Sequence, residues 1–255
     1  MNIMVFDTET TSIEKPFCYN IGYLIFDTDR HEVLIKRDFV VEQVWHNSML
    51  FTTTYYADKR EIYVNRMKAR KVRMEKFGYI TQQMYRDIVE FEIQHAYAYN
   101  CRFDIGVFEW NCDWFKCINP LDTIAVHDIR GYVHRKIAWS ENFQAWCDER
   151  KEYTESGNYS TTAQTIFRYM TGDTEWEEEH TALADSEIEC HILCECVAQG
   201  CEWNEDYKVY RSIVKNEIRQ FEVIDSEGNS HIFDYTSKRH FNNENGLRFT
   251  IKQRD

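Results

Sequence analysis

Residues 2–11 have the sequence Asn-Ile-Met-Val-Phe-Asp-Thr-Glu-Thr-Thr, an apolar run that ends in two acidic residues. A short apolar run of this kind predicts a buried strand near the middle of a sheet. Side chains two apart on a strand point to the same face, so we expect Asp7 and Glu9 to project together. Two further segments of the chain also place an acidic residue beside an apolar run.

The second segment is Ala-Tyr-Asn-Cys-Arg-Phe-Asp, residues 98–104, in which Asp104 opens a helix just after a predicted strand. The third is His-Thr-Ala-Leu-Ala-Asp, residues 180–185. Five positions along a helix correspond to a rotation of roughly 140°. We therefore expect His180 on the loop or first turn before a helix that contains Asp185, where the histidine can accept a proton while the aspartate binds metal.

These residue types in this order predict metal-dependent cleavage of phosphodiesters. Hard cations such as Mg²⁺ or Mn²⁺ prefer carboxylate oxygens. Two such ions about 4 Å apart can activate a water and stabilise the leaving oxygen. An isolated Asp-x-Glu would indicate only a surface turn, and Asp104 alone could be a helix cap. The three motifs together favour the catalytic interpretation.

The motifs resemble those of the DEDDh 3′→5′ exonucleases, which have an RNase H-like fold and include the epsilon-type proofreading enzymes of polymerases. The family patterns Asp-x-Glu, Asn-x-x-x-Asp and His-x-x-x-x-Asp match, in family order, Asp7–Glu9, Asn100–Asp104 and His180–Asp185. The resemblance covers roughly residues 1–199. Thr181 stands where a sister subgroup has tyrosine, and Ser12 stands where the family often has glycine.

The resemblance implies roles for individual residues. It implies two divalent metal ions, Mg²⁺ or Mn²⁺, with His180 as the general base. The first ion would be held by Asp7, Glu9 and Asp185. Asp7 would also bridge to the second ion, which Asp104 would hold through water. At the terminal nucleotide the resemblance implies Thr10 near the 3′-OH and Ile13 as an apolar wedge. The remaining substrate-binding residues it implies line the nucleotide pocket, namely Asn100 and Phe103.

The predicted fold class is α/β: an RNase H-like mixed five-stranded sheet flanked by helices, with a small C-terminal β-hairpin. We expect strands over 2–6, 19–27, 32–41, 95–99 and 116–119. Helices are expected over 54–76, 81–94, 103–111, 121–131, 139–149, 160–170 and 180–199. The exonuclease domain would span residues 1–205, with a basic helical insertion at about 45–80. Residues 206–255 would form a β-rich appendage with a hairpin over 217–235 and a third strand over 247–252.

The formal net charge of −13 argues against broad, non-specific coating of DNA. The charge is unevenly distributed, however, because the stretch from Lys59 to Lys76 contains eight basic and only two acidic residues. Such a stretch indicates either a nucleic-acid contact or a solvated helix face. The tryptophan pairs, Trp110 with Trp114 and Trp139 with Trp146, are more typical of a core than of base-stacking platforms.

The first residues lack the basic and apolar regions of a signal peptide, and no stretch approaches the length of a membrane span. We therefore expect a cytoplasmic protein that contacts no membrane. The nine cysteines should then be reduced. The cluster from Cys190 to Cys201 could form a zinc site or, more simply, pack a helix against the core.

Three functions are compatible with the sequence. The first is a free-standing exonuclease that removes nucleotides from the 3′ end of single-stranded DNA or RNA and releases nucleoside 5′-monophosphates. The second is a proofreading subunit docked on a DNA polymerase or another replication or repair protein. The third is a nucleic-acid-binding regulator that kept the fold and lost turnover, which the presence of all five catalytic residues disfavours.

Overall fold

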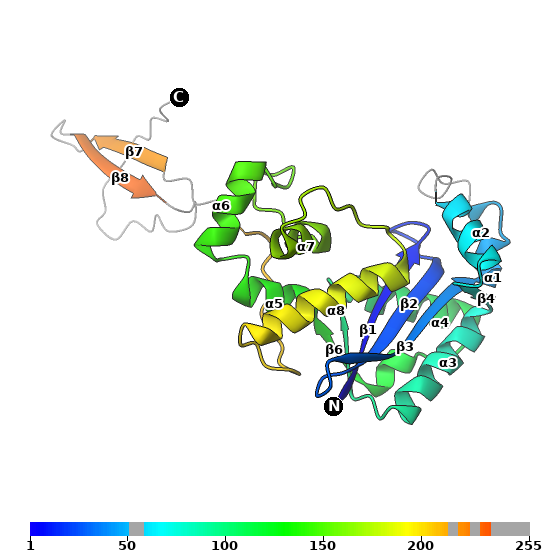
Figure 1. The fold of residues 1–255 in the computed structure, drawn as a ribbon. Coiled ribbons are helices and arrows are strands. Elements are labelled where there is room, and N and C mark those ends of the chain that lie inside the picture. The colour runs from blue at the N-terminus through cyan, green and yellow to red at the C-terminus, as the bar shows by residue number, and fades with distance from the viewer. Residues whose placement is uncertain (51–58, 214–218, 225–229, 236–255) are drawn as a thin grey trace.

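The computed structural model describes residues 1–50, 59–213, 219–224 and 230–235. A mixed sheet is covered by helices on both faces (Figure 1). The strands are β1 (Asn2–Thr10), β2 (Cys18–Asp27), β3 (Glu32–Val41), β4 (Arg73–Glu75), β5 (His95–Ala98), β6 (Ala125–Asp128), β7 (Arg219–Ile224) and β8 (Ser230–Tyr235). The helices are α1 (Glu42–Trp45), α2 (Arg60–Lys68), α3 (Phe77–Glu90), α4 (Arg102–Phe115), η2 (Pro120–Thr123), α5 (Ile129–Lys136), α6 (Glu141–Arg150), α7 (Ala163–Thr171) and α8 (Ala182–Ala198).

The main sheet has six strands in the order β4-β3-β2-β1-β5-β6. Strands β1, β2 and β3 form an antiparallel meander, whereas β5 and β6 run parallel to β1, and β4 runs parallel to β3. The mixed α/β sheet predicted from the sequence is thus confirmed. Because β1 lies inside the sheet, the acidic residues at its end are placed between the two helical layers.

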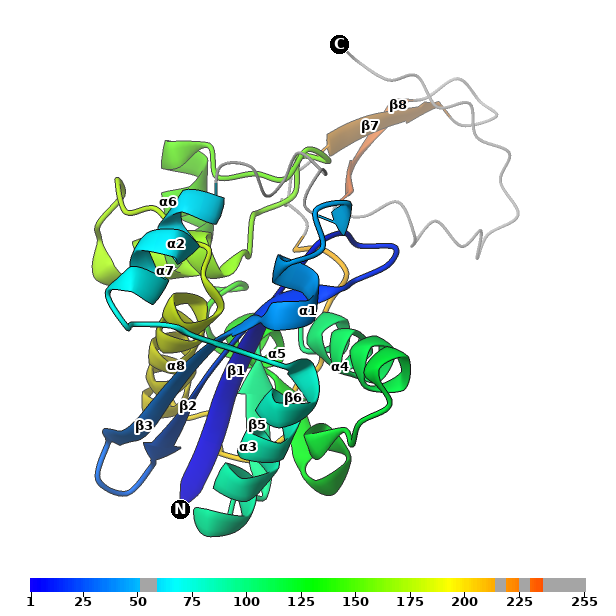
Figure 2. The ribbon, with the colours of Figure 1, turned by 90° about the vertical axis from the view of Figure 1, so that its right-hand side faces the viewer.

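The two faces of β1 belong to two separate apolar cores. Met4 and Phe6 pack with buried residues of α3 and α4, and Ile3 and Val5 pack with buried residues of α5 and α8. Figures 1 and 2 show α8 on one side of the sheet, with α3 and α4 on the other. The period-2 alternation of a strand therefore directs Asp7 and Glu9 toward the α8 layer and Thr8 toward the α4 layer.

The prediction of five strands was wrong in count and in one position. Residues 116–119 form no strand, and the strand expected there lies at 125–128 as β6, inside a segment predicted to be helical. β6 is only four residues long and runs parallel to β5. Its first residue, Ala125, pairs with His95, and its last, Asp128, pairs with Ala98. This tertiary partner, which periodicity does not reveal, overrides the local helical pattern.

The expected long basic helix over 54–76 is divided in the structure. The described part contains the nine-residue α2, then a turn with Arg70 at a φ of 57°, then β4 along the edge of the sheet. Residues 51–58, where the predicted helix would begin, lie outside the described residues. The added strand β4 accounts for the sixth strand of the sheet.

The chain after α8 runs back over the main domain as far as Ile213. Ile213 is 1% exposed, and its carbonyl oxygen accepts a hydrogen bond from the Tyr159 amide at 3.0 Å. The predicted hairpin forms as β7 and β8, which pair antiparallel in a separate two-stranded sheet. The strand expected over 247–252 lies outside the described residues. No helix in the described ranges is both long and apolar enough to cross a membrane.

Candidate active site

The end of β1 and the first turn of α8 bring three carboxylates together. Asp7 and Glu9 project from the same face of β1, and Asp185 lies at the fourth position of α8. One carboxylate oxygen from each of the three lies within 4.8 Å of the others. Two of the three motifs predicted from the sequence, separated by about 170 residues, therefore form one site.

Asp104 reaches the same region from the opposite helical layer. It is the third residue of α4 and is 2% exposed. Its Oδ1 accepts hydrogen bonds from the Thr8 hydroxyl at 2.6 Å and from the Thr8 amide at 3.2 Å. Thr8 thus connects the second motif to the strand between Asp7 and Glu9. Asp104 is a member of neither converging group of potential metal ligands among the described residues.

His180 precedes α8 by two residues and is half-exposed. Its φ of 54° lies in the left-handed region, which is uncommon for a residue other than glycine. Its Nδ1 lies 3.6 Å from an Oε2 of Glu178. Glu178, His180 and Asp185 form a second converging group whose ligand atoms lie within 4.8 Å of one another. The expected arrangement, with the histidine before the helix and the aspartate inside it, is what the structure contains.

The concentration of carboxylates perturbs their ionisation. Burial, followed by the charges of Asp104 and Glu189, raises the pKa of Asp7 well above its ordinary value. Burial raises the pKa of Asp104 to about 7, although its hydrogen bonds from Thr8 oppose the shift. Burial and then Glu178 raise the pKa of Asp185 to about 8. The site therefore contains more carboxylates than neighbouring cations can neutralise, and a bound divalent ion would supply the missing positive charge.

The residues fit a divalent metal. Asp185 is 6% exposed, and its Oδ1 is buried without a hydrogen-bond partner in the described part of the chain. Buried polar atoms without a partner are rare and costly, so this oxygen is available as a ligand. The converging donor atoms are carboxylate oxygens and one imidazole nitrogen, which suit hard cations.

Two acidic residues of the site were not predicted from the sequence. Glu189 is 4% exposed and accepts a hydrogen bond from the Tyr99 amide at 3.2 Å. Burial, then Asp104 and Asp185, raises its pKa well above the ordinary value. Glu189 follows Asp185 by four residues, so their shared helix face was a usable signal. Glu178, two residues before His180, is the other residue, and its place within an acidic run concealed it.

The basic segment contributes a cation to the site. The Nζ of Lys59, just before α2, lies 3.3 Å from both carboxylate oxygens of Glu9. Each of the two side chains is 17% exposed. Arg66 is also engaged, with ion pairs to Asp38 and Glu179. These two members of the segment therefore make intramolecular contacts. The described members that lie on the surface are Arg60, Lys68, Arg70, Lys71, Arg73 and Lys76.

The predicted substrate-binding residues lie at the end of β1, in the loop that follows it, and at or just before the start of α4. Thr10 ends β1, and Ile13 in the following loop is 85% exposed. Asn100 has a φ of 60°, and its backbone N–H donates to Asp128 Oδ1 at 2.9 Å, just before α4. Phe103, the second residue of α4, is partly buried against the core. Their roles toward a nucleotide stay a prediction.

Two other sequence interpretations are addressed by the structure. Cys190, Cys196 and Cys201 are buried in the apolar core around α8, and neither converging ligand group of the described chain contains a cysteine. This arrangement favours packing over a zinc site.

The assignment of the tryptophans to the core was wrong for Trp114, which is 60% exposed on α4, and for the half-exposed Trp110 and Trp139.

No protein-family model and no curated protein matches this sequence. Solved structures with a similar fold do exist. One is a 3′-exonuclease from a study of 3′-end-specific recognition of a histone mRNA stem-loop. It has 12% identity and a TM-score of 0.54, covering 92% of this chain and 91% of that one. A full-length 3′-exonuclease has 12% identity and a TM-score of 0.50, and the alignment covers 93% of this chain and 68% of that one. The nuclease domain of 3′hExo, described as a DEDDh family member and bound to rAMP, has 12% identity and a TM-score of 0.49, covering 83% and 97%.

The chain therefore has the RNase H-like fold of the 3′-exonucleases. The first two alignments establish this at the level of fold, since identity is only 12%. The resemblance drawn from the three motifs is confirmed to the same extent. What the site does with that fold depends on its own residues.

Proposed function

We propose that this protein is a metal-dependent 3′→5′ exonuclease that hydrolyses single-stranded DNA or RNA and releases nucleoside 5′-monophosphates. The observation that carries the proposal is the convergence of Asp7, Glu9 and Asp185, with a buried carboxylate oxygen of Asp185 left without a partner. The similarity of the fold to solved 3′-exonucleases supports the same class of reaction.

Asp7, Glu9 and Asp185 would hold a first divalent ion, and Asp7 with Asp104 would hold a second. Bound there, Mg²⁺ or Mn²⁺ would lower the pKa of a water and stabilise the developing charge on the leaving oxygen. Thr8 keeps Asp104 in place through two hydrogen bonds. Lys59 would neutralise part of the remaining charge on Glu9, which lies within ion-pair distance.

His180 would accept the proton of the attacking water. Partial burial, followed by the charge of Lys59, lowers the pKa of its imidazole from the ordinary value of 6.5. The ring is therefore neutral at pH 7 and able to act as a base. Its half-exposed position before α8 leaves it accessible from solvent, as a base that serves an incoming strand must be.

The terminal nucleotide would lie between the loop that follows β1 and the start of α4. Ile13 would pack against the last base, and Thr10 would contact the 3′-OH. Asn100 and Phe103 would line the opposite wall. The loop after β1 is held by Asn111 of α4, which donates to the Pro16 carbonyl at 2.7 Å and accepts from the Cys18 amide at 3.1 Å.

The test is degradation of 5′-labelled single-stranded DNA and RNA of equal sequence, with and without Mn²⁺ or Mg²⁺. We expect stepwise shortening from the 3′ end that requires the metal. Asp7→Asn and His180→Ala should each lower kcat by roughly 10²–10⁴-fold, the range for loss of a general base or its equivalent. Asp113→Asn, an 86% exposed carboxylate on α4, is the matched control and should leave the rate unchanged.

Cleavage that persists in Asp7→Asn would refute the assignment of the site. If the pure protein binds metal and oligonucleotide but cleaves neither strand, the free-standing enzyme is excluded. The same assay with a polymerase present would then decide between a partner-dependent proofreading subunit and a non-catalytic binding protein.

A further inference from the structure

We propose that Arg66 of α2 is a positioning residue that holds His180 in its left-handed conformation. The inference rests on the proposed function, in which His180 is the general base. It gives the segment between β3 and α3 a role in catalysis, because α2 would hold the loop that carries the base.

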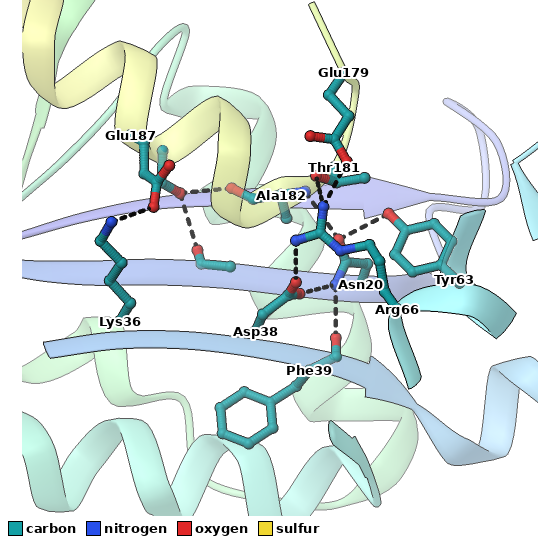
Figure 3. A network of polar contacts seen from close by, with 12 residues as sticks. Asn20, Lys36, Asp38, Phe39, Tyr63, Arg66, Glu179, Thr181, Ala182 and Glu187 are labelled. Carbon is teal, nitrogen blue, oxygen red and sulfur yellow. Dashed lines mark hydrogen bonds and ion pairs between the residues drawn. The ribbon is translucent and has the colours of Figure 1, made fainter. Parts of the chain in front are cut away.

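The contacts of Arg66 lie on both sides of His180. Its Nη1 donates to the Glu179 carboxylate at 2.6 Å and to the Thr181 hydroxyl at 3.0 Å (Figure 3). One guanidinium nitrogen thus contacts the residue before and the residue after the histidine. His180 has a φ of 54°, and a non-glycine residue in this strained region persists only where its surroundings hold it. The guanidinium supplies such a restraint.

Arg66 is itself firmly held. Its Nη2 donates to Asp38 Oδ2 at 2.8 Å, and the side chains of Arg66 and Asp38 are 17% and 1% exposed. Asp38 in turn accepts a hydrogen bond from the side-chain Nδ2 of Asn20 at 2.7 Å. A charged pair with so little exposure has a fixed geometry, unlike the salt bridges of a solvated helix face. The guanidinium therefore connects strand β3 to the His180 loop.

The same network fixes the start of α8. Thr181 is the N-cap residue, but its side chain makes no capping hydrogen bond. The Ala182 amide instead donates to Asn20 Oδ1 at 2.8 Å, and the Tyr63 hydroxyl of α2 donates to the same oxygen at 2.8 Å. Asn20 replaces the usual cap and leaves the Thr181 hydroxyl to accept from Arg66. Helix α2 is thereby connected to the turn between His180 and Asp185.

An alternative is that Arg66 only stabilises the fold. The two roles predict different kinetics, because a misplaced base lowers kcat while substrate affinity is kept, whereas loss of folded protein lowers the amount of active enzyme alone. They also differ in chemistry. A lysine ammonium is a compact point charge and cannot span Asp38 on one side with Glu179 and Thr181 on the other. Arg66→Lys should therefore not restore the rate.

The experiment compares four forms of the full chain: wild type, Arg66→Ala, Arg66→Lys and the control Lys36→Ala. Lys36 of β3 forms an exposed ion pair with Glu187 of α8, the helix that follows His180. The two atoms are 2.7 Å apart, and the side chains are 50% and 41% exposed. We expect Arg66→Ala and Arg66→Lys to lower kcat on the order of 10- to 100-fold with KM changed by no more than about threefold. Lys36→Ala should stay within about twofold of wild type.

A second measurement does not depend on activity. The ¹⁵N spectrum of the His180 imidazole, assigned with His180→Gln, should show shifted and broadened resonances in Arg66→Ala and unchanged ones in Lys36→Ala. If Arg66→Ala does not fold, the pair Glu179→Ala with Thr181→Val removes the two acceptors and keeps the Asp38 pair. It should give the same loss of kcat and the same spectral change.

Unchanged kcat together with an unchanged imidazole spectrum, in a folded Arg66 variant or in the acceptor pair, would overturn the proposal. A uniform loss of active protein without a change in kcat per folded molecule would do the same, because it indicates a purely structural role. If the wild type cleaves nothing, the proposed exonuclease function fails, and the imidazole spectrum still decides whether Arg66 holds His180.

Discussion

At the scale of single residues, the site is defined by acids that share one small volume. Four of them, together with His180, could be predicted because their spacing matches known motifs. Glu178 and Glu189 were not predicted: the spacing of Glu189 from Asp185 offered a signal, but the acidic run around Glu178 offered none. Burial raises the pKa of Asp7, Asp104, Asp185 and Glu189 alike. A site of this kind makes the metal-free fold less stable, and the same carboxylates bind a cation.

The loss of stability in the metal-free fold can be measured at Asp185. Its pKa in the folded protein, about 8, lies above the ordinary value of 3.8. Between about pH 4 and pH 8 the folded state therefore keeps a proton that the unfolded state has released. Its contribution to the free energy of unfolding falls as the pH rises through that window. We expect Asp185→Asn without metal to raise the Tm at pH 8 by roughly 2–8 °C and to change it little near pH 4.

The same variant should lose the response to metal. Saturating Mn²⁺ at pH 8 should raise the Tm of the wild type and leave that of Asp185→Asn nearly unchanged, because binding to the folded state alone stabilises it. Differential scanning calorimetry with and without Mn²⁺ measures both effects. A lower Tm of Asp185→Asn at both pH values would show that the Asp185 carboxylate is satisfied in the metal-free fold.

At the scale of elements, the decisive contact is the approach of α8 to β2. A β-carbon built on Gly22 would overlap the backbone of Ala182 and Leu183. The Gly22 carbonyl also accepts a hydrogen bond from the Ser186 hydroxyl at 3.2 Å. Only glycine allows the helix to come this close, and Asp185 lies next to Ser186. The distance between helix and sheet therefore sets where the third motif meets the first.

Gly22→Ala should move α8 away from the sheet. We expect a loss of roughly 1–3 kcal/mol in the free energy of unfolding, as for other overpacked positions, together with weaker Mn²⁺ binding. Urea unfolding and calorimetric titration of Mn²⁺ measure the two quantities. Gly106→Ala on α4 is the matched control, because a β-carbon there meets nothing within 4 Å and helix propensity should make it stabilising by about 1 kcal/mol. Equal effects of the two substitutions would contradict this account.

At the scale of the whole molecule, the chain from Asp206 to Ile213 packs on the predicted exonuclease domain. The Tyr207 ring contacts the Tyr132 ring with centroids 4.8 Å apart. The Tyr210 amide donates to Nδ1 of the buried His134 at 2.9 Å. A domain boundary after residue 205 would assign Tyr207 and Tyr210 to the appendage, although Tyr132 and His134, which they contact, belong to the exonuclease domain. These contacts favour a boundary after Ile213 as the more stable choice.

Two truncations test this point. A chain ending at residue 213 should keep the Tm of the full chain within a few degrees. A chain ending at residue 205 should lose about 3 kcal/mol or more in the free energy of unfolding, because the buried Ile213 and the partly buried Tyr207 ring are removed together with the hydrogen bonds to Tyr159 and His134. Chemical unfolding of both truncated chains measures the difference. Equal stability of the two would restore the boundary at 205.

The sequence alone determined the motifs from which the proposed chemistry of this protein follows. The motifs at Asp7–Glu9, Asn100–Asp104 and His180–Asp185 are local, and the apolar runs beside them predicted the strand β1 and the helices α4 and α8. The tertiary structure decided the rest. β6 is a strand because β5 lies beside it, and Arg66 lies between Asp38 and Glu179 because the fold brings α2 next to β3 and to the residues that precede α8. Contacts between residues distant in the sequence leave no period in it, so only the folded chain reveals them.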